Sequence, residues 1–288
     1  MLFLMISTKA SQRYTSLAIN SLLRSTFFRK KDRLLVIDND GDLDISDVCG
    51  WDLIKNEAPR GFAENANCGL RLARKLKTDL ILLNNDIIFT KHWLEFMNPK
   101  SDRISVPYCN QDVQYSQGGF SLHFAMNLAD YDENNDSNLE IIAERHRRLC
   151  ETSRFNNVIF SLIPFFCAHI PYEVSVETGD FDESFGRGGG EDVDYRLRAA
   201  MAGFRTEKTP ESYVLHFMGK STWLSGEAGD ITSSRDRLYR NRFSEKWGDA
   251  VASLFLAGPD KIQMAEKLGV FNFIKENNLG GALRALLK

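Results

Sequence analysis

Residues 79–86 read Asp-Leu-Ile-Leu-Leu-Asn-Asn-Asp (DLILLNND), and this stretch decides the fold class. A strand of a parallel sheet is covered by helices on both faces, so its sequence is a nearly continuous apolar run rather than an alternating one. DLILL is therefore interpreted as a central parallel strand. Asn84, Asn85 and Asp86 follow directly at its carboxyl end.

Strands and helices alternate on the amino-terminal side of this stretch. Strands are expected at 2–6, 33–37 and 51–55, and helices at 10–25 and 61–77. Such alternation indicates βαβ units, and hence an α/β fold whose mostly parallel central sheet is flanked by helices. Ligands of these sheets bind beyond the carboxyl ends of the strands. Asp38 and Asn84–Asp86 are both placed there.

The rest of the chain is less regular. Residues 108–157 combine a polar tract with a charged helix at 138–152, and we interpret them as an insertion or flap within a domain spanning 1–232. Later elements are expected as a strand at 158–169, a loop ending at 190, a helix over 191–202, and short strands at 204–208 and 212–216. Residues 233–288 are expected to form a helical carboxyl-terminal extension with a break at Gly258-Pro259.

Composition limits the classes of protein that remain. The 288 residues are 43% hydrophobic and 26% charged, and the net charge of −3 shows no basic excess for nucleic acid. Five cysteines without C-x-x-C spacing predict neither a disulfide framework nor a zinc site. The start MLFLMIS lacks the features of a signal peptide, and no stretch approaches the roughly 20 apolar residues of a membrane span. A cytoplasmic location is expected, with peripheral membrane contact left open.

Oxygen-bearing side chains at the strand ends are the first candidate site residues. Asp86 can hold a hard divalent cation that is bridged to a diphosphate. Asp38 can accept hydrogen bonds from a base or a ribose. The alternative for both is a strand-end turn in which Asn and Asp bond the backbone.

A second set of acids lies in Gly190-Glu191-Asp192-Val193-Asp194. The dipole at a helix start favours negative charge, which by itself explains three acids there. The preceding glycine-rich run predicts a mobile loop at 184–190 over a site, like the polar tract 108–137. Asp192 can then act as general base on an acceptor hydroxyl, with its pKa held low by the dipole.

His216 follows the apolar run Tyr213-Val214-Leu215. A lone histidine is usually a structural residue, and as a metal ligand it needs a carboxylate nearby. The fold can bring Asp86 close to it. One oxygen and one nitrogen ligand suit Mn²⁺ at least as well as Mg²⁺.

Several segments, in this order and spacing, resemble family 2 glycosyltransferases, notably rhamnosyltransferase-like members. They are NEAPRGFAENANCG (56–69), LILLNND (80–86), GDFDESF (179–185), GEDVD (190–194), RLRAAMAGF (196–204), VLHFMGKS (214–221) and NRFSEKW (241–247). The resemblance spans most of residues 1–247. It covers neither 108–157 nor the last 40 residues well.

The resemblance implies a GT-A fold, that of the nucleotide-diphospho-sugar transferases, and an inverting, metal-dependent transfer from a nucleotide-sugar to an acceptor hydroxyl. It implies nucleotide contacts at Ser7 and Thr8 and a base contact at Asp38. Arg60 and Asn67 fall in the segment that lines the nucleotide and phosphates. We also count Asn85 among the nucleotide-binding candidates.

The resemblance further implies roles for the acids and the histidine. Asp86 falls on the last acid of the D-x-D metal motif, and His216 on a histidine that ligates the metal in some members. Asp192 falls on the catalytic base, with Glu191 as the rival. Asn84 replaces the first D-x-D acid, so weaker metal affinity and a larger role for His216 are expected.

Two other functions stay open. A nucleotidyltransferase usually carries a glycine- and basic-rich phosphate loop after the first strand, whereas Ser7–Ser11 contains no glycine. A non-catalytic sugar-nucleotide or glycan-binding module has no need of the acids in GEDVD. The acceptor is equally open among a glycan, a lipid-linked sugar, a protein and a modified nucleobase.

Overall fold

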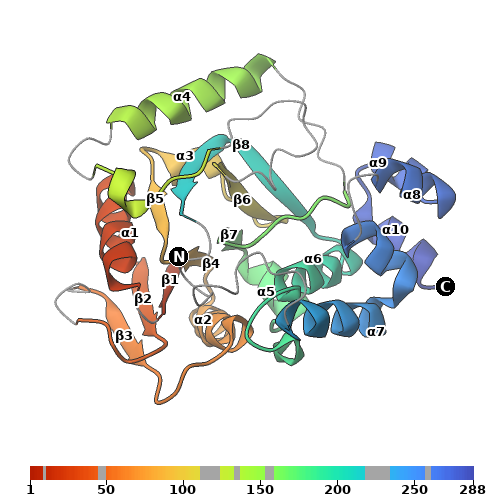
Figure 1. Cartoon of the computed structure of the whole chain (residues 1–288), viewed down its shortest axis with the longest axis horizontal. Helices are drawn as coiled ribbons and strands as arrows, with labels where there is room; N and C mark the ends of the chain where they lie inside the picture. Colours follow the sequence, from red (N-terminus) through yellow and green to blue (C-terminus); the bar gives the residue numbers. More distant parts are fainter. Residues whose placement is uncertain are drawn as a thin grey trace.

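The computed structural model describes residues 1–8, 11–44, 50–110, 124–132, 137–152, 159–217, 234–256 and 261–288. One eight-stranded sheet runs through it in the order β3-β2-β1-β4-β7-β6-β8-β5 (Figure 1). The strands are β1 (Leu2–Ser7), β2 (Arg33–Asp38), β3 (Asp52–Lys55), β4 (Leu80–Asn84), β5 (Ile87–Phe89), β6 (Arg103–Cys109), β7 (Cys167–Ile170) and β8 (Arg205–His216).

Helices cover both faces of this sheet and continue to the carboxyl terminus (Figure 1). They are α1 (Gln12–Ser25), α2 (Phe62–Leu76), α3 (Trp93–Met97), α4 (Ser137–Thr152), α5 (Tyr172–Thr178), α6 (Glu191–Met201), α7 (Ser234–Leu256), α8 (Lys261–Lys267), α9 (Phe271–Lys275) and α10 (Leu279–Leu286). Two 3₁₀ turns, η3 (Leu128–Asp130) and η4 (Glu183–Phe185), complete the regular structure.

The amino-terminal half of the sheet is parallel, as the apolar strand sequences predict. β1 pairs with β2 on one side and with β4 on the other, and β2 pairs with β3, all in parallel. Every residue of β1 is buried. Because the strand order reverses between β1 and β4, right-handed crossovers place α1 and α2 on opposite faces. The switch point between the carboxyl ends of β1 and β4 is where such sheets bind ligands.

The second half of the sheet mixes directions. β7 is antiparallel to β4 and β6, β5 is antiparallel to β8, and β6 is parallel to β8. β8 is one strand of 12 residues rather than the two short strands expected. Its pairing with β6 shifts register at Pro107/Tyr108, which explains why the sequence pattern breaks there.

The expected strand at 158–169 is wrong over most of its length. Only its end is strand, in β7, and residues 161–166 have no regular structure. Hydrogen bonds hold this segment: the Asn84 N–H donates to Phe166 O, the Phe165 N–H donates to Asp192 Oδ2, and the Arg196 guanidinium donates to Ser161 O. Because the chain turns away from the sheet, Pro164–Phe166 can line a cleft instead of extending β7.

The carboxyl-terminal helices have their own apolar core. Phe243, Trp247 and Phe255 of α7 pack with Leu197 of α6 and Leu283 of α10. The expected helical extension is therefore present and fixed against α6. The expected break at Gly258-Pro259 lies outside the described residues, as do parts of 108–157.

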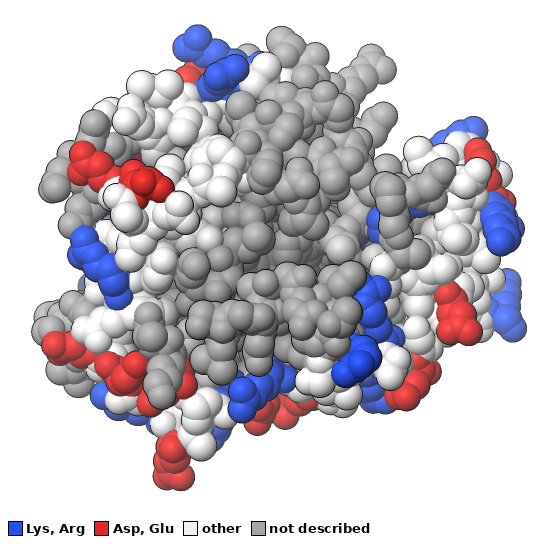
Figure 2. Space-filling model, viewed as in Figure 1, with Lys and Arg blue, Asp and Glu red and all other residues white. Residues whose placement is uncertain are grey.

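No helix in the described ranges is long and apolar enough to cross a membrane. On the face in Figure 2, acidic and basic side chains alternate around the part of the surface that is described. Such mixed charge matches the net charge of −3.

Candidate active site

A small hollow marks the switch point between β1 and β4. Its lining consists of Ile6, Thr8, Asn39, Arg60, Phe62, Asn65 and Asn84. The structure thus brings Thr8 and Arg60, two of the predicted nucleotide contacts, to the same hollow. Arg60 is exposed, so its guanidinium is available to a phosphate.

Three asparagines fix the backbone beside this hollow. Asn39 Oδ1 accepts from Asn56 Nδ2, Asn65 Nδ2 and the Arg60 N–H, each at 2.9 Å. Asn39 Nδ2 in turn donates to Arg60 O at 3.1 Å. Sequence reasoning missed Asn39 and Asn65, because an asparagine in a turn gives no sign of a long-range partner. These bonds fix the backbone of Arg60 beside the switch point.

Asp38 holds the loop that follows β2. Its side chain is fully buried, and its carboxylate accepts from the Gly41 N–H at 2.9 Å and the Leu43 N–H at 3.2 Å. Lys55 Nζ lies 3.6 Å from Asp38 Oδ2. The strand-end turn is therefore present, and contact with a nucleotide base remains a prediction.

Ser7 and Asn85 face the start of α1. Ser7 Oγ lies 3.0 Å from Thr15 Oγ1, and Asn85 Nδ2 donates to Ser11 Oγ and Thr15 Oγ1, each at 2.7 Å. Both residues are buried. They connect β1, the end of β4 and α1, so they act on a bound nucleotide only by holding these elements in position.

Asn67 is also fully buried, and the structure does not bring it to the hollow. Its Oδ1 accepts from the Phe181 N–H at 2.7 Å, and its Nδ2 donates to Phe181 O and to Glu183 Oε1. This amide joins α2 to the turn before the glycine-rich loop. Its role is to position the two segments relative to each other.

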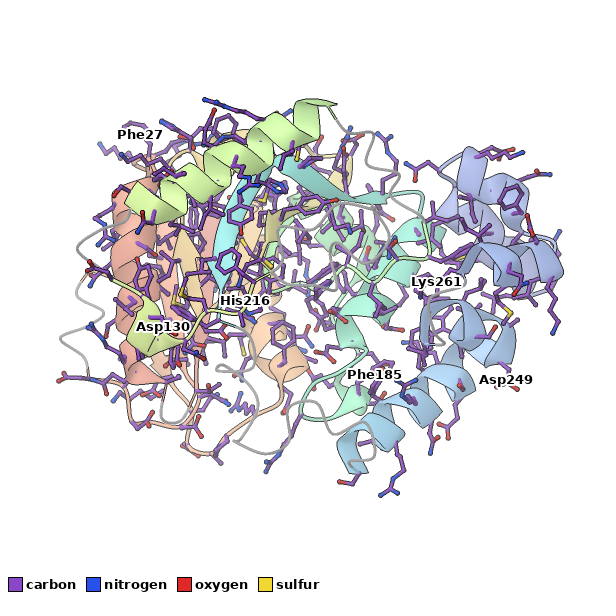
Figure 3. All side chains as sticks on the ribbon, turned by 45° about the horizontal axis from the view of Figure 1, so that its top comes forward. Phe27, Asp130, Phe185, His216, Asp249 and Lys261 are labelled. Carbon is purple, nitrogen blue, oxygen red and sulfur yellow. The ribbon has the colours of Figure 1, made fainter. Side chains whose placement is uncertain are left out.

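Asp86 and His216 meet at the carboxyl ends of β4 and β8. Asp86 is fully buried, and its Oδ1 lies 3.2 Å from His216 Nε2. The imidazole stacks on Phe166 with ring centroids 4.8 Å apart and an interplanar angle of 14°. His216 lies near the centre of the molecule (Figure 3). The proximity that the sequence could only suggest is therefore present.

This pair fits two adjacent positions around a divalent cation. Ligands at about 2.1–2.2 Å in neighbouring octahedral positions are about 3 Å apart. The described residues bring no third His, Cys, Asp or Glu into such a group. Diphosphate oxygens and water would have to complete the coordination.

Asp192, Glu191 and His216 line one cleft of about 240 Å³. Its other lining residues are Phe62, Asn84, Pro164, Phe165, Phe166, Gly188 and Gly189. Phe62 and Asn84 also line the hollow at the switch point, so the two spaces adjoin each other. The aromatic residues of this lining were missed from sequence, because 158–169 was interpreted as a plain strand.

Asp192 sits at the start of α6 with both oxygens bonded. Oδ1 accepts from the Val193 N–H at 2.7 Å and Oδ2 from the Phe165 N–H at 3.3 Å. Burial raises its pKa, while these N–H groups and the charge of Arg196 act in the opposite direction. The expectation that the helix dipole lowers this pKa was wrong, because loss of water outweighs the dipole. A raised pKa makes Asp192 a stronger base than an ordinary carboxylate.

The neighbouring acids have other partners. Glu191 accepts a hydrogen bond from the Gly189 N–H and so holds the glycine-rich loop. Asp194 is fully buried and is bound by Arg198 Nε at 2.8 Å, Lys246 Nζ at 2.7 Å and Trp247 Nε1 at 2.9 Å. Asp194 therefore links α6 to α7 and does not face the cleft.

The glycine-rich loop is packed between α2 and α7. The Phe62 N–H donates to Arg187 O, and a Cβ on Gly61 would come within 2.4 Å of Gly186 O. A Cβ on Gly190 would come within 2.8 Å of the Tyr239 ring. Glycine is thus required for close approach, rather than only for the flexibility that the sequence suggested.

Comparison with known proteins identifies the fold. No family model and no curated protein matches the sequence. A crystal structure of GalNAc-T7 with UDP, GalNAc and Mn²⁺ matches 96% of this chain with a TM-score of 0.61 and 15% identity. The fold is GT-A. This GT-A chain spans 56% of the length of that GalNAc-T7 chain.

A second match is the mannosyltransferase PcManGT from Pyrobaculum calidifontis in complex with GDP-Man and Mn²⁺. It covers 99% of this chain and 85% of that one, with a TM-score of 0.48 and 12% identity. At 15% identity, the match to GalNAc-T7 establishes the fold alone. The expected fold class is confirmed, and the activity has to be argued from the site.

Proposed function

We propose that this chain is a metal-dependent, inverting glycosyltransferase that moves a sugar from a nucleotide-sugar to an acceptor hydroxyl. One observation carries the proposal: the cleft that is lined by Asp192 and His216 adjoins the hollow at the sheet's switch point, with Phe62 and Asn84 lining both. A donor bound across both spaces would place its nucleotide near Thr8 and Arg60. Its sugar would then lie near Asp192.

Asp86 and His216 are the residues that would hold a divalent cation, Mn²⁺ or Mg²⁺. When bound, the cation would supply charge neutralisation on the diphosphate. Arg60 contributes a second positive charge at the hollow as the nucleoside diphosphate departs. A buried carboxylate next to an imidazole supports this assignment, and a nucleotide-sugar donor would provide the missing oxygen ligands.

Asp192 takes the proton of the acceptor hydroxyl in this proposal. A sugar hydroxyl is a poor nucleophile until it loses its proton, and a carboxylate with a raised pKa accepts that proton more readily. The cleft also holds the two reactants in one orientation. Attack from the face opposite the leaving group inverts the anomeric carbon. Glu191 remains the alternative base.

The finer assignments are part of the same proposal. Membership of family 2, a rhamnosyltransferase-like specificity, and a cytoplasmic location with peripheral membrane contact rest on the sequence resemblance. We assign residues 1–232 to the catalytic domain and 233–288 to an extension that Asp194 anchors through Lys246 and Trp247. A glycan, a lipid-linked sugar, a protein or a modified nucleobase can serve as acceptor.

A screen of nucleotide-sugars tests the proposal directly. Release of nucleoside diphosphate is measured for each donor with Mn²⁺, with Mg²⁺ and with EDTA. The proposal expects hydrolysis or transfer with at least one donor that depends on the cation. Binding of a donor without any turnover by wild-type protein would favour a sugar-nucleotide-binding module, and release of pyrophosphate from a nucleoside triphosphate would favour a nucleotidyltransferase.

A further inference from the structure

A second hollow lies at the opposite end of α6 from Asp192. It measures about 100 Å³ and is lined by Ile159, Arg196, Ala200, Gly203, Phe204, Arg205, Thr206, Asn277, Asn278, Leu279, Gly280 and Arg284. Three of these described lining residues are arginines and none is acidic. Because α6 has 11 residues, its two ends are about 16 Å apart. The two spaces share no lining residue, although Arg196 of this hollow lies one helical turn from Asp192 and its charge acts on that carboxylate.

Arg196 supplies a buried cation to the hollow. Its side chain is 4% exposed, Nη2 donates to Ile159 O at 2.7 Å, and Nη1 donates to Ser161 O. The Nε–H has no partner among the residues that the structure describes. A buried donor without an acceptor is costly, so a ligand that offers an oxygen here would be favoured.

Two buried lysines, Lys208 and Lys261, lie close enough to Arg196 for its charge to act on them. Burial, followed by the positive charge of Arg196, lowers the pKa of Lys208 and the pKa of Lys261 to about 8 each. Lys261 donates to Leu254 O at 2.8 Å and to Phe255 O at 3.1 Å, which are neutral acceptors. Figure 3 shows Lys261 well away from His216, beside the carboxyl-terminal helices. The Asp192 carboxylate offsets part of the charge of Arg196, and neither lysine lines the hollow, so the positive charge at the hollow itself comes from its three arginines.

The amino terminus of α10 forms another wall. Asn278 Oδ1 accepts from the Gly281 N–H at 2.8 Å, and the Ala282 N–H donates to Asn278 O. In helix geometry the N–H groups of Leu279 and Gly280 are then left for an external acceptor. A Cβ on Gly280 would come within 2.3 Å of Ala200 O, so glycine is needed for α10 to approach α6 this closely.

The other two arginines are accessible from solvent. Arg205 is more than half exposed and pairs with Asp102 at 3.1 Å. Arg284 is exposed, and its Nη1 donates to Met201 O at 3.3 Å. Each guanidinium has five N–H donors, so these single bonds leave donors for a ligand. The hollow therefore combines one buried and two accessible guanidinium groups with a helix start.

We propose that this hollow binds a phosphate group, either free in solution or as the phosphomonoester headgroup of a lipid. A tetrahedral oxyanion presents several acceptors to guanidinium forks and helix N–H groups at once. The volume of about 100 Å³ exceeds the roughly 30 Å³ that one water takes in the liquid, so a group of several atoms fits. The proposal holds whether or not the cleft transfers sugar.

Calorimetry with inorganic phosphate at constant ionic strength tests the site. Wild-type protein is compared with Arg284→Gln, with the double variant Arg205→Gln/Arg284→Gln, and with the control Arg24→Gln, which removes an exposed arginine of α1. The expected loss of phosphate affinity is at least tenfold in the double variant and smaller in Arg284→Gln, with none in the control. Circular dichroism checks that each variant is folded.

Vesicles distinguish the two sources of phosphate. Phosphatidylcholine vesicles with and without phosphatidic acid are sedimented with each protein. Retention of wild type and of Arg24→Gln on phosphatidic acid, but not of the double variant, with release by inorganic phosphate, assigns the lipid source. Binding of phosphate without vesicle retention assigns the soluble source. The proposal is overturned if the double variant binds phosphate as tightly as wild type, or if phosphate binds no more tightly than chloride.

Discussion

Replacement of Asp192 by asparagine is the most informative perturbation of the cleft. The substitution keeps the shape and removes the basicity. Asparagine retains one carbonyl oxygen, so one of the two N–H bonds, from Val193 or from Phe165, is lost. That loss should lower the free energy of unfolding by about 1 kcal/mol, which leaves the protein folded. Loss of the general base should lower kcat by about 10²–10⁴.

The assay separates binding from chemistry. Donor affinity is measured by calorimetry and transfer by steady-state kinetics, because proton acceptance belongs to the transition state and should change kcat alone. Glu191→Gln is the matched control for charge at the same helix start, and it should retain most of the transfer rate. Near wild-type transfer by Asp192→Asn together with an inactive Glu191→Gln would assign the general base to Glu191 instead of Asp192.

The pH profile gives a second readout of the same residue. Because the pKa of Asp192 is raised, wild-type activity should fall on acidification at a higher pH than an ordinary aspartate permits. Residual activity of Asp192→Asn should lack this acid limb. Asp194→Asn should behave differently, since it breaks a buried network with Arg198 and Lys246 and should lower the free energy of unfolding by about 3 kcal/mol.

Three further predictions test other parts of the structure. Activity should vanish with EDTA and return with Mn²⁺, and turnover that persists after chelation would contradict the metal dependence. Asp86→Ala should abolish the stimulation of nucleotide binding by Mn²⁺. Asp38→Ala leaves the Gly41 and Leu43 N–H groups without acceptors and should lower the free energy of unfolding by about 1–3 kcal/mol, measured in urea, with weaker donor binding. Lys208 has a folded pKa of about 8, below its unfolded value, so burial of its charge destabilises the fold at neutral pH, and this cost declines as pH rises above 8. Lys208→Met should therefore raise the free energy of unfolding at pH 7 and flatten its dependence on pH. An unchanged urea midpoint would refute this prediction.

The parallel half of the sheet was predictable because burial on both faces requires a nearly continuous run of apolar residues in each strand. DLILL became β4, and the strands at 2–6 and 33–37 became β1 and β2 within one residue of the expected ends. The candidate site residues after β1 and β4 were predicted from the rule that ligands bind beyond strand ends. Thr8 and Arg60 do line a hollow at that point.

Elements whose form depends on distant partners were not predictable. The segment before β7 is shaped by Arg196 and Asp192, which lie more than 25 residues later in the chain. Asn67 looks like any polar residue on a helix until Phe181 is folded against it. The raised pKa of Asp192 depends on how much protein surrounds the carboxylate, a quantity that a motif does not contain.

The most direct test of the central claim follows the anomeric carbon during turnover. With the donor identified by the screen, proton NMR records the configuration of the first transferred product and its rate of formation with Mn²⁺. Wild-type protein is expected to give an inverted product, and Asp192→Asn is expected to form it about 10²–10⁴-fold more slowly. A product with retained configuration, or equal rates for the two proteins, would contradict an inverting transfer in which Asp192 is the base.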